Sequence, residues 1–209
     1  MADELVFYTN PMSRGRIVRW MLEEIGYPYR TEYLDFTAGA TRTPEFLAIN
    51  PMGKIPVIRY GTTVVSETPA IVAYLADLFP EAGLAPPVTD PNRGAYFRWL
   101  FFAAGPFEAA ITNKRFGFAI PPEKTGFCGY GSYEAVMDMM EYAVTQSPYL
   151  AGEHFTAADV YAGAMLGFGL RFDMVEKRPA FEKYWAHIST RPAALRAAAI
   201  DDAQLPKAA

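Results

Sequence analysis

The chain has 209 residues and a formal net charge of −4; 51% of its residues are apolar and 20% are charged. This balance is typical of a globular protein with one large or two small domains, and it excludes a chain kept disordered by its charge. The sequence has no basic run that would favour a nucleic-acid partner and no run of ~18 apolar residues that could cross a membrane.

Cys128 is the only cysteine, which excludes an internal disulfide and any Cys-x-x-Cys redox or zinc site. The two histidines, His154 and His187, lack the spacing of a metal site, so we expect no metal. The N-terminal Met-Ala-Asp-Glu has neither the basic segment nor the apolar stretch of a signal peptide. These features together predict a cytoplasmic protein.

The first 35 residues predict a strand, a helix and a second strand. Residues 5–8 are a short β-prone apolar run that ends at the turn signal Asn10-Pro11. Apolar residues recur at helical spacing from Ile17 to Ile25, and Gly26 stands where a helix cap is expected. Residues 29–34 form the second strand, which the helical crossover would place parallel to the first.

Two further β-prone runs, residues 55–58 and 62–65, are separated by Tyr60-Gly61 and predict an antiparallel hairpin. A helix is expected to begin near Ser66 and to end before Pro80. This order, within 80 residues, predicts an α/β unit with a small four-stranded mixed sheet covered by helices.

A proline-rich linker follows, and Asp90-Pro91 provides the N-cap and first turn of a new helix. Beyond it the apolar spacing predicts only helices, near residues 92–116, 131–146, 157–172 and 180–198. We therefore expect an α/β domain over residues 1–80, a linker over 81–90 and an all-α helical bundle over 91–209.

Residues 155–160 carry the clearest local helix signal of the second half. Thr156 can cap a helix while the Asp159 carboxylate reaches back to the Thr156 amide, and Phe155 can pack onto Val160. These residues predict that a helix begins near Thr156.

Four segments, which stand in the family's order along the chain, resemble the cytosolic glutathione S-transferase family. The sequence is similar to bacterial members of this family and does not indicate a class. Residues 50–57 resemble its N-P-x-G-x-[VIL]-P segment, and residues 66–75 its E-S-x-A-I-x-x-Y-L helix start, with Thr68 in place of the usual serine. Residues 156–159 resemble its [ST]-x-A-D capping box, and residues 8–19 its first strand, active-site loop and helix. The resemblance implies a thioredoxin-like N-terminal domain and a helical C-terminal domain.

The resemblance also implies a glutathione site. A cis peptide bond before Pro56 would turn the backbone of Ile55 outward, where the family pairs it with the cysteinyl backbone of glutathione. Glu67 and Thr68, at a helix N-terminus, suit the γ-glutamyl group, and Lys54 is a candidate for the glycine carboxylate. The alternative is that Glu67 and Thr68 form an ordinary helix cap and bind no ligand.

The expected chemistry is activation of the glutathione thiol. A hydroxyl donor at the start of the first helix is sufficient to stabilise the thiolate. Ser13 stands in the loop before the helix, as in serine-using classes, and Tyr8 ends the first strand, as in tyrosine-using classes. We favour Ser13 over Tyr8, with Asn10 or a backbone amide as the remaining alternative.

The resulting expectation is a glutathione transferase whose thiolate attacks a small apolar electrophile, with aromatic residues of 96–118 lining the acceptor pocket. A homodimer is implied by the resemblance alone. The alternatives are a glutathione-dependent peroxidase or disulfide reductase, and a non-catalytic ligand-binding or adaptor protein. Because the loop of residues 9–14 has no cysteine, glutaredoxin-like turnover is disfavoured.

Overall fold

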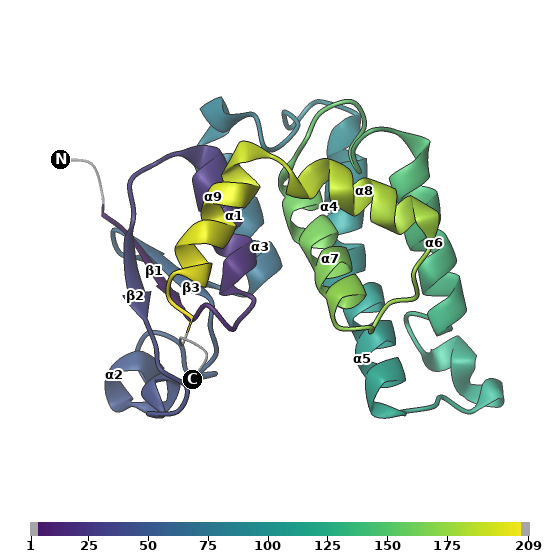
Figure 1. Cartoon of the computed structure of the whole chain (residues 1–209), viewed down its shortest axis with the longest axis horizontal. Helices are drawn as coiled ribbons and strands as arrows, with labels where there is room; N and C mark the ends of the chain where they lie inside the picture. The colour runs from purple at the N-terminus through teal and green to yellow at the C-terminus, as the bar shows by residue number, and fades with distance from the viewer. Residues whose placement is uncertain (1–3, 206–209) are drawn as a thin grey trace. The chain divides into compact units, whose positions relative to one another are not determined.

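The computed structural model describes residues 4–205 (Figure 1). Contacts among these residues divide them into two units, residues 4–82 with 191–205, and residues 83–190. This division differs from the expected one at the C-terminal end, because the last helix packs on the N-terminal unit instead of joining a domain that starts at residue 91.

The N-terminal unit contains a four-stranded mixed sheet in the order β2-β1-β3-β4. Its strands are β1 (Leu5–Thr9), β2 (Arg30–Tyr33), β3 (Val57–Tyr60) and β4 (Thr63–Ser66). β1 is parallel to β2, and β3 is antiparallel to both β1 and β4. The predicted strand–helix–strand unit and the predicted hairpin are therefore confirmed. Gly61, in the hairpin turn, has a φ of 56°, which glycine adopts without steric cost.

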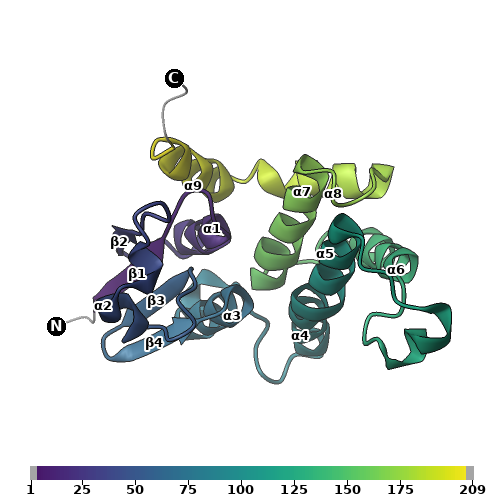
Figure 2. The same cartoon turned by 90° about the horizontal axis from the view of Figure 1, so that it is seen from below.

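Three helices, α1 (Gly15–Ile25), α3 (Thr68–Leu78) and α9 (Pro192–Asp202), lie on one side of this sheet (Figure 2). The predicted apolar face of α1 is buried, and the helix ends at Gly26 in the left-handed conformation. The short helix α2 (Pro44–Leu47) was not predicted. It has four residues and is capped by Thr43, whose hydroxyl accepts a hydrogen bond from the Phe46 amide at 3.3 Å.

Arg19 is a charged residue of α1 that is buried. Its side chain is 1% exposed, because α9 covers the second face of the helix. Its Nε donates to Asp201 Oδ1 at 3.0 Å. The two terminal nitrogens donate to the hydroxyls of Thr31 at 2.8 Å, Tyr33 at 3.1 Å and Tyr29 at 3.2 Å. One guanidinium on α1 thus contacts β2, the residue Tyr29 just before that strand, and α9.

Burial governs the protonation of this cluster. It raises the pKa of Asp201, by more than the charge of Arg19 lowers it. It also raises the pKa of Tyr29 to about 12. Asp201 Oδ2 is buried and has no hydrogen-bond partner among the described residues. The ionised pair therefore carries a desolvation cost that only the contacts of Arg19 offset.

The second unit, residues 83–190, is helical, and its only bridge among described residues is the isolated Tyr149–Gly152 pair. Three of the predicted helices are confirmed. The first is α4 (Asn92–Phe102), which continues through a π-helical segment at Ala103–Phe107 into α5 (Glu108–Phe116). The second is α6 (Tyr133–Gln146), and the third is a π-helical segment at Asp159–Gly163 that leads into α7 (Ala164–Arg171). Within residues 4–205, no helix is long and apolar enough to span a bilayer.

The single helix expected over residues 180–198 is two helices, α8 (Pro179–Ser189) and α9. Pro192 begins α9, and Arg191 before it is extended, with a ψ of 140°. A proline has no amide hydrogen and disfavours helical backbone in the residue before it, so the helix is interrupted there.

The capping prediction for Asp159 is confirmed. Its fully buried carboxylate accepts hydrogen bonds from the amides of Thr156 at 2.8 Å and Leu150 at 2.7 Å. The hydroxyls of Thr156 and Tyr184 donate to the same carboxylate at 2.9 and 2.6 Å. These bonds join the start of the π-helical segment to α8 inside the second unit.

Arg19→Met keeps an apolar chain of similar length but leaves the Asp201 charge buried without its partner. We expect the free energy of unfolding in urea at pH 7 to fall by about 3–5 kcal/mol. The loss should shrink toward about pH 4, because a carboxyl of raised pKa is more readily neutralised there.

Arg30→Met is the matched control, since Arg30 pairs with Glu4 at 2.8 Å while remaining 47% exposed. An exposed ion pair contributes little to stability, because water and salt screen its charges. If Arg19→Met cost no more than Arg30→Met, the buried pair would not hold the unit together.

Candidate active site

The register of the sheet brings the expected site segments to one end of it. Tyr8 at the end of β1 is paired with Val57 at the start of β3, and Val57 is paired with Ser66 at the end of β4. The loop after β1, the Ile55–Pro56 segment and the start of α3 therefore leave the sheet side by side. Both α1 and α3 begin at this end, so it collects two helix N-termini, which favour negative charge.

The loop between β1 and α1 is held by Asn10. The side-chain nitrogen of Asn10 donates to the Leu34 carbonyl at 2.8 Å, and its side-chain oxygen accepts from the backbone amide of Met12 at 2.9 Å. The Asn10 carbonyl accepts from the Ser13 amide at 3.0 Å. A backbone turn fixed at both ends carries Ser13 to the start of α1.

Ser13 is half-buried and its hydroxyl takes part in two hydrogen bonds. It donates to the Asn10 carbonyl at 2.7 Å and accepts from the Gly15 amide at 3.0 Å. A hydroxyl has one hydrogen, which can rotate toward a new acceptor. The Gly15 amide would polarise the O–H bond further, so Ser13 is placed to donate to an anion beside the loop.

Tyr8 lies on the face of the sheet opposite to α1. The Arg19 guanidinium on α1 lies 5.1 Å from the centre of the Phe7 ring, so Phe7 is on the face of β1 that α1 covers. Tyr8 is the next residue along the strand, and its side chain therefore points to the opposite face. Tyr8 is 9% exposed and packs with Phe46 at 6.0 Å between ring centroids.

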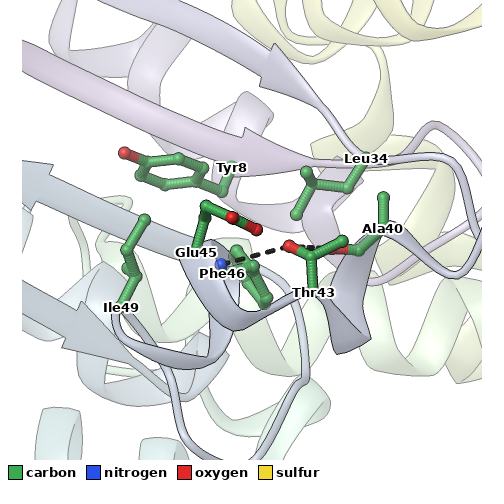
Figure 3. Close-up of a pocket in the computed structure, with 7 residues that line it drawn as sticks. All are labelled: Tyr8, Leu34, Ala40, Thr43, Glu45, Phe46 and Ile49. Carbon is green, nitrogen blue, oxygen red and sulfur yellow. Dashed lines mark hydrogen bonds between the residues drawn. The ribbon is translucent and has the colours of Figure 1, made fainter.

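A pocket of about 230 Å³ lies beside Tyr8 on this face. Figure 3 shows the Tyr8 hydroxyl pointing away from Leu34 and Ala40. The lining residues are Tyr8, Leu34, Ala40, Thr43, Glu45, Phe46 and Ile49. Ser13 is not among them, so the two candidate hydroxyls lie in different surroundings.

The Ile55–Pro56 peptide bond is cis, as the resemblance implied. The side-chain amide nitrogen of Asn50 donates to the Lys54 carbonyl at 2.8 Å and holds the segment before Ile55. Ile55 packs against the cluster that contains Tyr8 and Val57, while its amide and carbonyl make no hydrogen bond among the described residues. This free backbone edge is able to pair with an extended ligand.

Two cations flank that edge. The Lys54 side chain is exposed. Arg42 donates to the Met52 carbonyl at 3.3 Å, which places a second positive charge along the same segment. The sequence reasoning missed Arg42, since it stands in a polar stretch with no motif of its own.

Glu67 and Thr68 begin α3 as predicted. Glu67 has a φ of 70°, which is uncommon for a residue other than glycine and is typical of functional positions. Its exposed side chain makes no capping bond, whereas Thr68, 6% exposed, occupies the first helical position. The unpaired amides of this turn are available to a carboxylate.

Among the described residues, no group of three or more histidine, cysteine, aspartate or glutamate side chains is arranged to hold a metal ion. The His187 ring stacks on Tyr149 at 5.3 Å between centroids. Cys128 is a free, half-buried thiol outside the N-terminal unit.

The contact between Thr9 and Gly15 was also missed by the sequence reasoning. Thr9 Oγ1 is buried without a hydrogen-bond partner among residues 4–205. A Cβ atom at Gly15 would collide with it and would lie 2.9 Å from Ser13 Oγ. Only glycine therefore lets the first turn of α1 approach β1 while Ser13 keeps its position.

Gly15→Ala should lower the free energy of unfolding by about 1–3 kcal/mol, the cost of overpacking, although alanine favours helix formation. Adding Thr9→Ala, which removes Oγ1, should recover part of this loss in urea unfolding. Adding Thr9→Ser, which keeps that oxygen, should recover less.

Gly94→Ala in α4 is the control, because a Cβ there meets nothing within 4 Å. It should be neutral or slightly stabilising. Equal stability of Gly15→Ala and wild-type protein would show that β1 and α1 do not need this close approach.

Two family models match the chain. The N-terminal domain of glutathione S-transferase matches residues 12–78, and the C-terminal domain of glutathione S-transferase matches residues 131–192. Glutathione S-transferase 3 of Zea mays is 28% identical over 201 residues, covering 90% of each chain. Glutathione S-transferase F10 of Arabidopsis thaliana is 27% identical over 186 residues, covering 82% of this chain and 86% of the relative.

Solved structures agree over almost the whole length. A glutathione transferase from Methylococcus capsulatus has a TM-score of 0.77 at 27% identity, covering 95% of this chain and 99% of its own. A glutathione transferase homologue from Sulfitobacter, with bound glutathione, has a TM-score of 0.73 at 26% identity, covering 97% and 99%. With both domain models matched in order and a fold shared over both units, the chain belongs to the glutathione S-transferase family.

Proposed function

We propose that the chain is a glutathione transferase that binds glutathione at the end of the sheet where β1, β3 and β4 are in register. The observation that carries this proposal is the convergence there of two helix N-termini, the free backbone edge of Ile55 and the Ser13 hydroxyl. The Sulfitobacter homologue with bound glutathione supports the choice of ligand.

Each part of glutathione has a proposed partner. The cysteinyl backbone pairs with the amide and carbonyl of Ile55, beside the buried Pro56. Glu67 receives the γ-glutamyl ammonium, and the first amides of α3 with the Thr68 hydroxyl receive its carboxylate. Lys54 binds the glycine carboxylate. The residues are therefore ordered so that the thiol is directed toward the loop of Ser13.

The energetics of thiol activation fit one hydroxyl acting together with the helix N-termini. Lowering a thiol pKa from about 8.5 by ~2 units requires ~2.7 kcal/mol of preference for the thiolate. A hydrogen bond to a charged acceptor contributes about 1.5–3 kcal/mol and a helix N-terminus about 0.3–1 kcal/mol. Because Ser13 must leave the Asn10 carbonyl, a neutral bond of about 0.5–1.5 kcal/mol, the helix N-termini supply a necessary part.

Ser13 is the proposed donor and Tyr8 is not. Ser13 stands just before α1, at the same end of the sheet as the free backbone edge of Ile55. Tyr8 instead packs into the face of the sheet that α2 covers. The thiol proton leaves to solvent, the thiolate forms a carbon–sulfur bond with the electrophile, and the leaving group of the electrophile departs with the electron pair. No step of this reaction requires a metal.

The second substrate is proposed to be a small apolar electrophile held by aromatic residues of 96–118. Phe97 and Phe101, with ring centroids 6.4 Å apart on α4, are 37% and 72% exposed and support this choice. A homodimer in the cytoplasm, the usual state of the family, completes the proposal.

Ser13→Ala should raise the pKa of the bound thiol and lower kcat/KM by about 10–100-fold, the value of one charged hydrogen bond. Tyr8→Phe, which removes a hydroxyl and keeps the ring, should change kcat/KM by less than about threefold. The assay follows conjugation of glutathione to an activated aryl halide as a function of pH.

Calorimetric titration of glutathione into both variants separates binding from activation. We expect both to bind, because the Ile55 edge and the start of α3 are intact. If Tyr8→Phe lowered kcat/KM and Ser13→Ala did not, Tyr8 would be the activating residue. If the wild-type protein did not bind glutathione at millimolar concentration, the chain would be an adaptor protein with this fold and not a transferase.

A further inference from the structure

Four ion pairs connect α1 to α9 and its first turn. Their order along the two helices is antiparallel, with basic residues at the start of α1 facing acidic residues at the end of α9. The pairs are Arg16–Asp202 at 2.6 Å, Arg19–Asp201 at 3.0 Å, Glu23–Arg196 at 3.1 Å and Glu24–Arg191 at 2.7 Å.

These charges oppose the dipole of the helix that carries them. Arg16 lies in the first turn of α1 and Asp202 in the last turn of α9, where the helix dipole disfavours each charge. Across the antiparallel contact, Arg16 instead faces the C-terminal end of α9 and Asp202 faces the N-terminal end of α1, and each of these ends favours the charge that it meets. The pairing is therefore specific to the docked position of α9.

One of the four pairs also reaches the active-site loop. Arg16 donates through one terminal nitrogen to Asp202 Oδ1 and through the other to the Pro11 carbonyl at 3.3 Å. Among the described residues, Pro11 O has no other hydrogen-bond donor. Pro11 is two residues from Ser13, so the end of α9 is linked through Arg16 to the loop that carries the proposed activating hydroxyl.

We infer that Asp202 is a positioning residue for the active-site loop, acting through Arg16. This inference rests on the proposed function of Ser13. The Asp202 carboxylate holds one side of the Arg16 guanidinium, which directs the other side at the Pro11 carbonyl. Without Asp202, Arg16 can turn to solvent, and Ser13 donates to the thiolate from a less well-defined position.

Positioning and direct electrostatics predict opposite signs. As a nearby negative charge, Asp202 would disfavour a thiolate, so removing it would lower the pKa of the bound thiol. As a positioning residue, it favours the thiolate, so removing it raises that pKa. The 58% exposure of Asp202 allows a substitution there without a buried defect.

The test compares Asp202→Asn with Arg196→Gln in the full chain. Arg196, which is 55% exposed, belongs to the same helix contact but bonds Glu23 and no atom of the loop. Both variants should lose similar, small amounts of thermal stability. Only Asp202→Asn should raise the pKa of bound glutathione, by about half a unit or more, and lower kcat/KM at pH 7 by ~3–10-fold.

Two further variants test the route through Arg16. Asp202→Glu keeps the carboxylate and should restore kcat/KM to within about twofold of wild type. In an Arg16→Gln background, Asp202→Asn should have no additional effect on the thiol pKa, since the link is already cut.

Equal thiol pKa values in Asp202→Asn and Arg196→Gln, or a lowered value in Asp202→Asn, would overturn the inference alone. An unperturbed thiol pKa in wild-type protein would overturn the proposed function and the inference with it. Pro11 and Ser13 remain untouched in all of these variants.

Discussion

The hydrogen-bonded pair of Arg19 and Asp201 is the contact on which the N-terminal unit most depends. Both side chains are removed from water, and one carboxylate oxygen of Asp201 has no partner among residues 4–205. A buried charge is tolerated only when its bonds are made, so α1 and α9 are stable in this unit only together. Since α1 starts at the loop of Ser13, a helix from the far end of the chain takes part in fixing the proposed active site.

The site itself follows from strand register and helix direction. Pairing of Val57 with both Tyr8 and Ser66 sets three chain segments beside one another, and two helices then begin at the same end of the sheet. The backbone supplies a free edge and a positive potential before any side chain contributes. The helix N-termini therefore supply part of the stabilisation of a thiolate, and the larger part left to a hydroxyl is within the range of one charged hydrogen bond.

Local patterns predicted much of this architecture, including β1, α1, the β3–β4 hairpin, α3 and the Asp159 cap. Each depends on residues close in sequence. The helix α2 was missed because four residues carry no periodicity, and the break before Pro192 was misread although proline marked it. The contact of Arg19 with Asp201 spans 182 residues and has no local signature. The face of β1 on which Tyr8 lies had no signature in the sequence, because it depends on how the strand packs against α1, whereas Ser13 stands in the loop after that strand.

The most direct test of the account is the thiol pKa of bound glutathione, measured by NMR titration of glutathione labelled with carbon-13 at the cysteinyl β-carbon. The wild-type protein at saturating ligand should show a midpoint at least about one unit below the ~8.5 of a free thiol. A midpoint equal to that of free glutathione, with binding retained, would show that this end of the sheet holds the ligand without activating it.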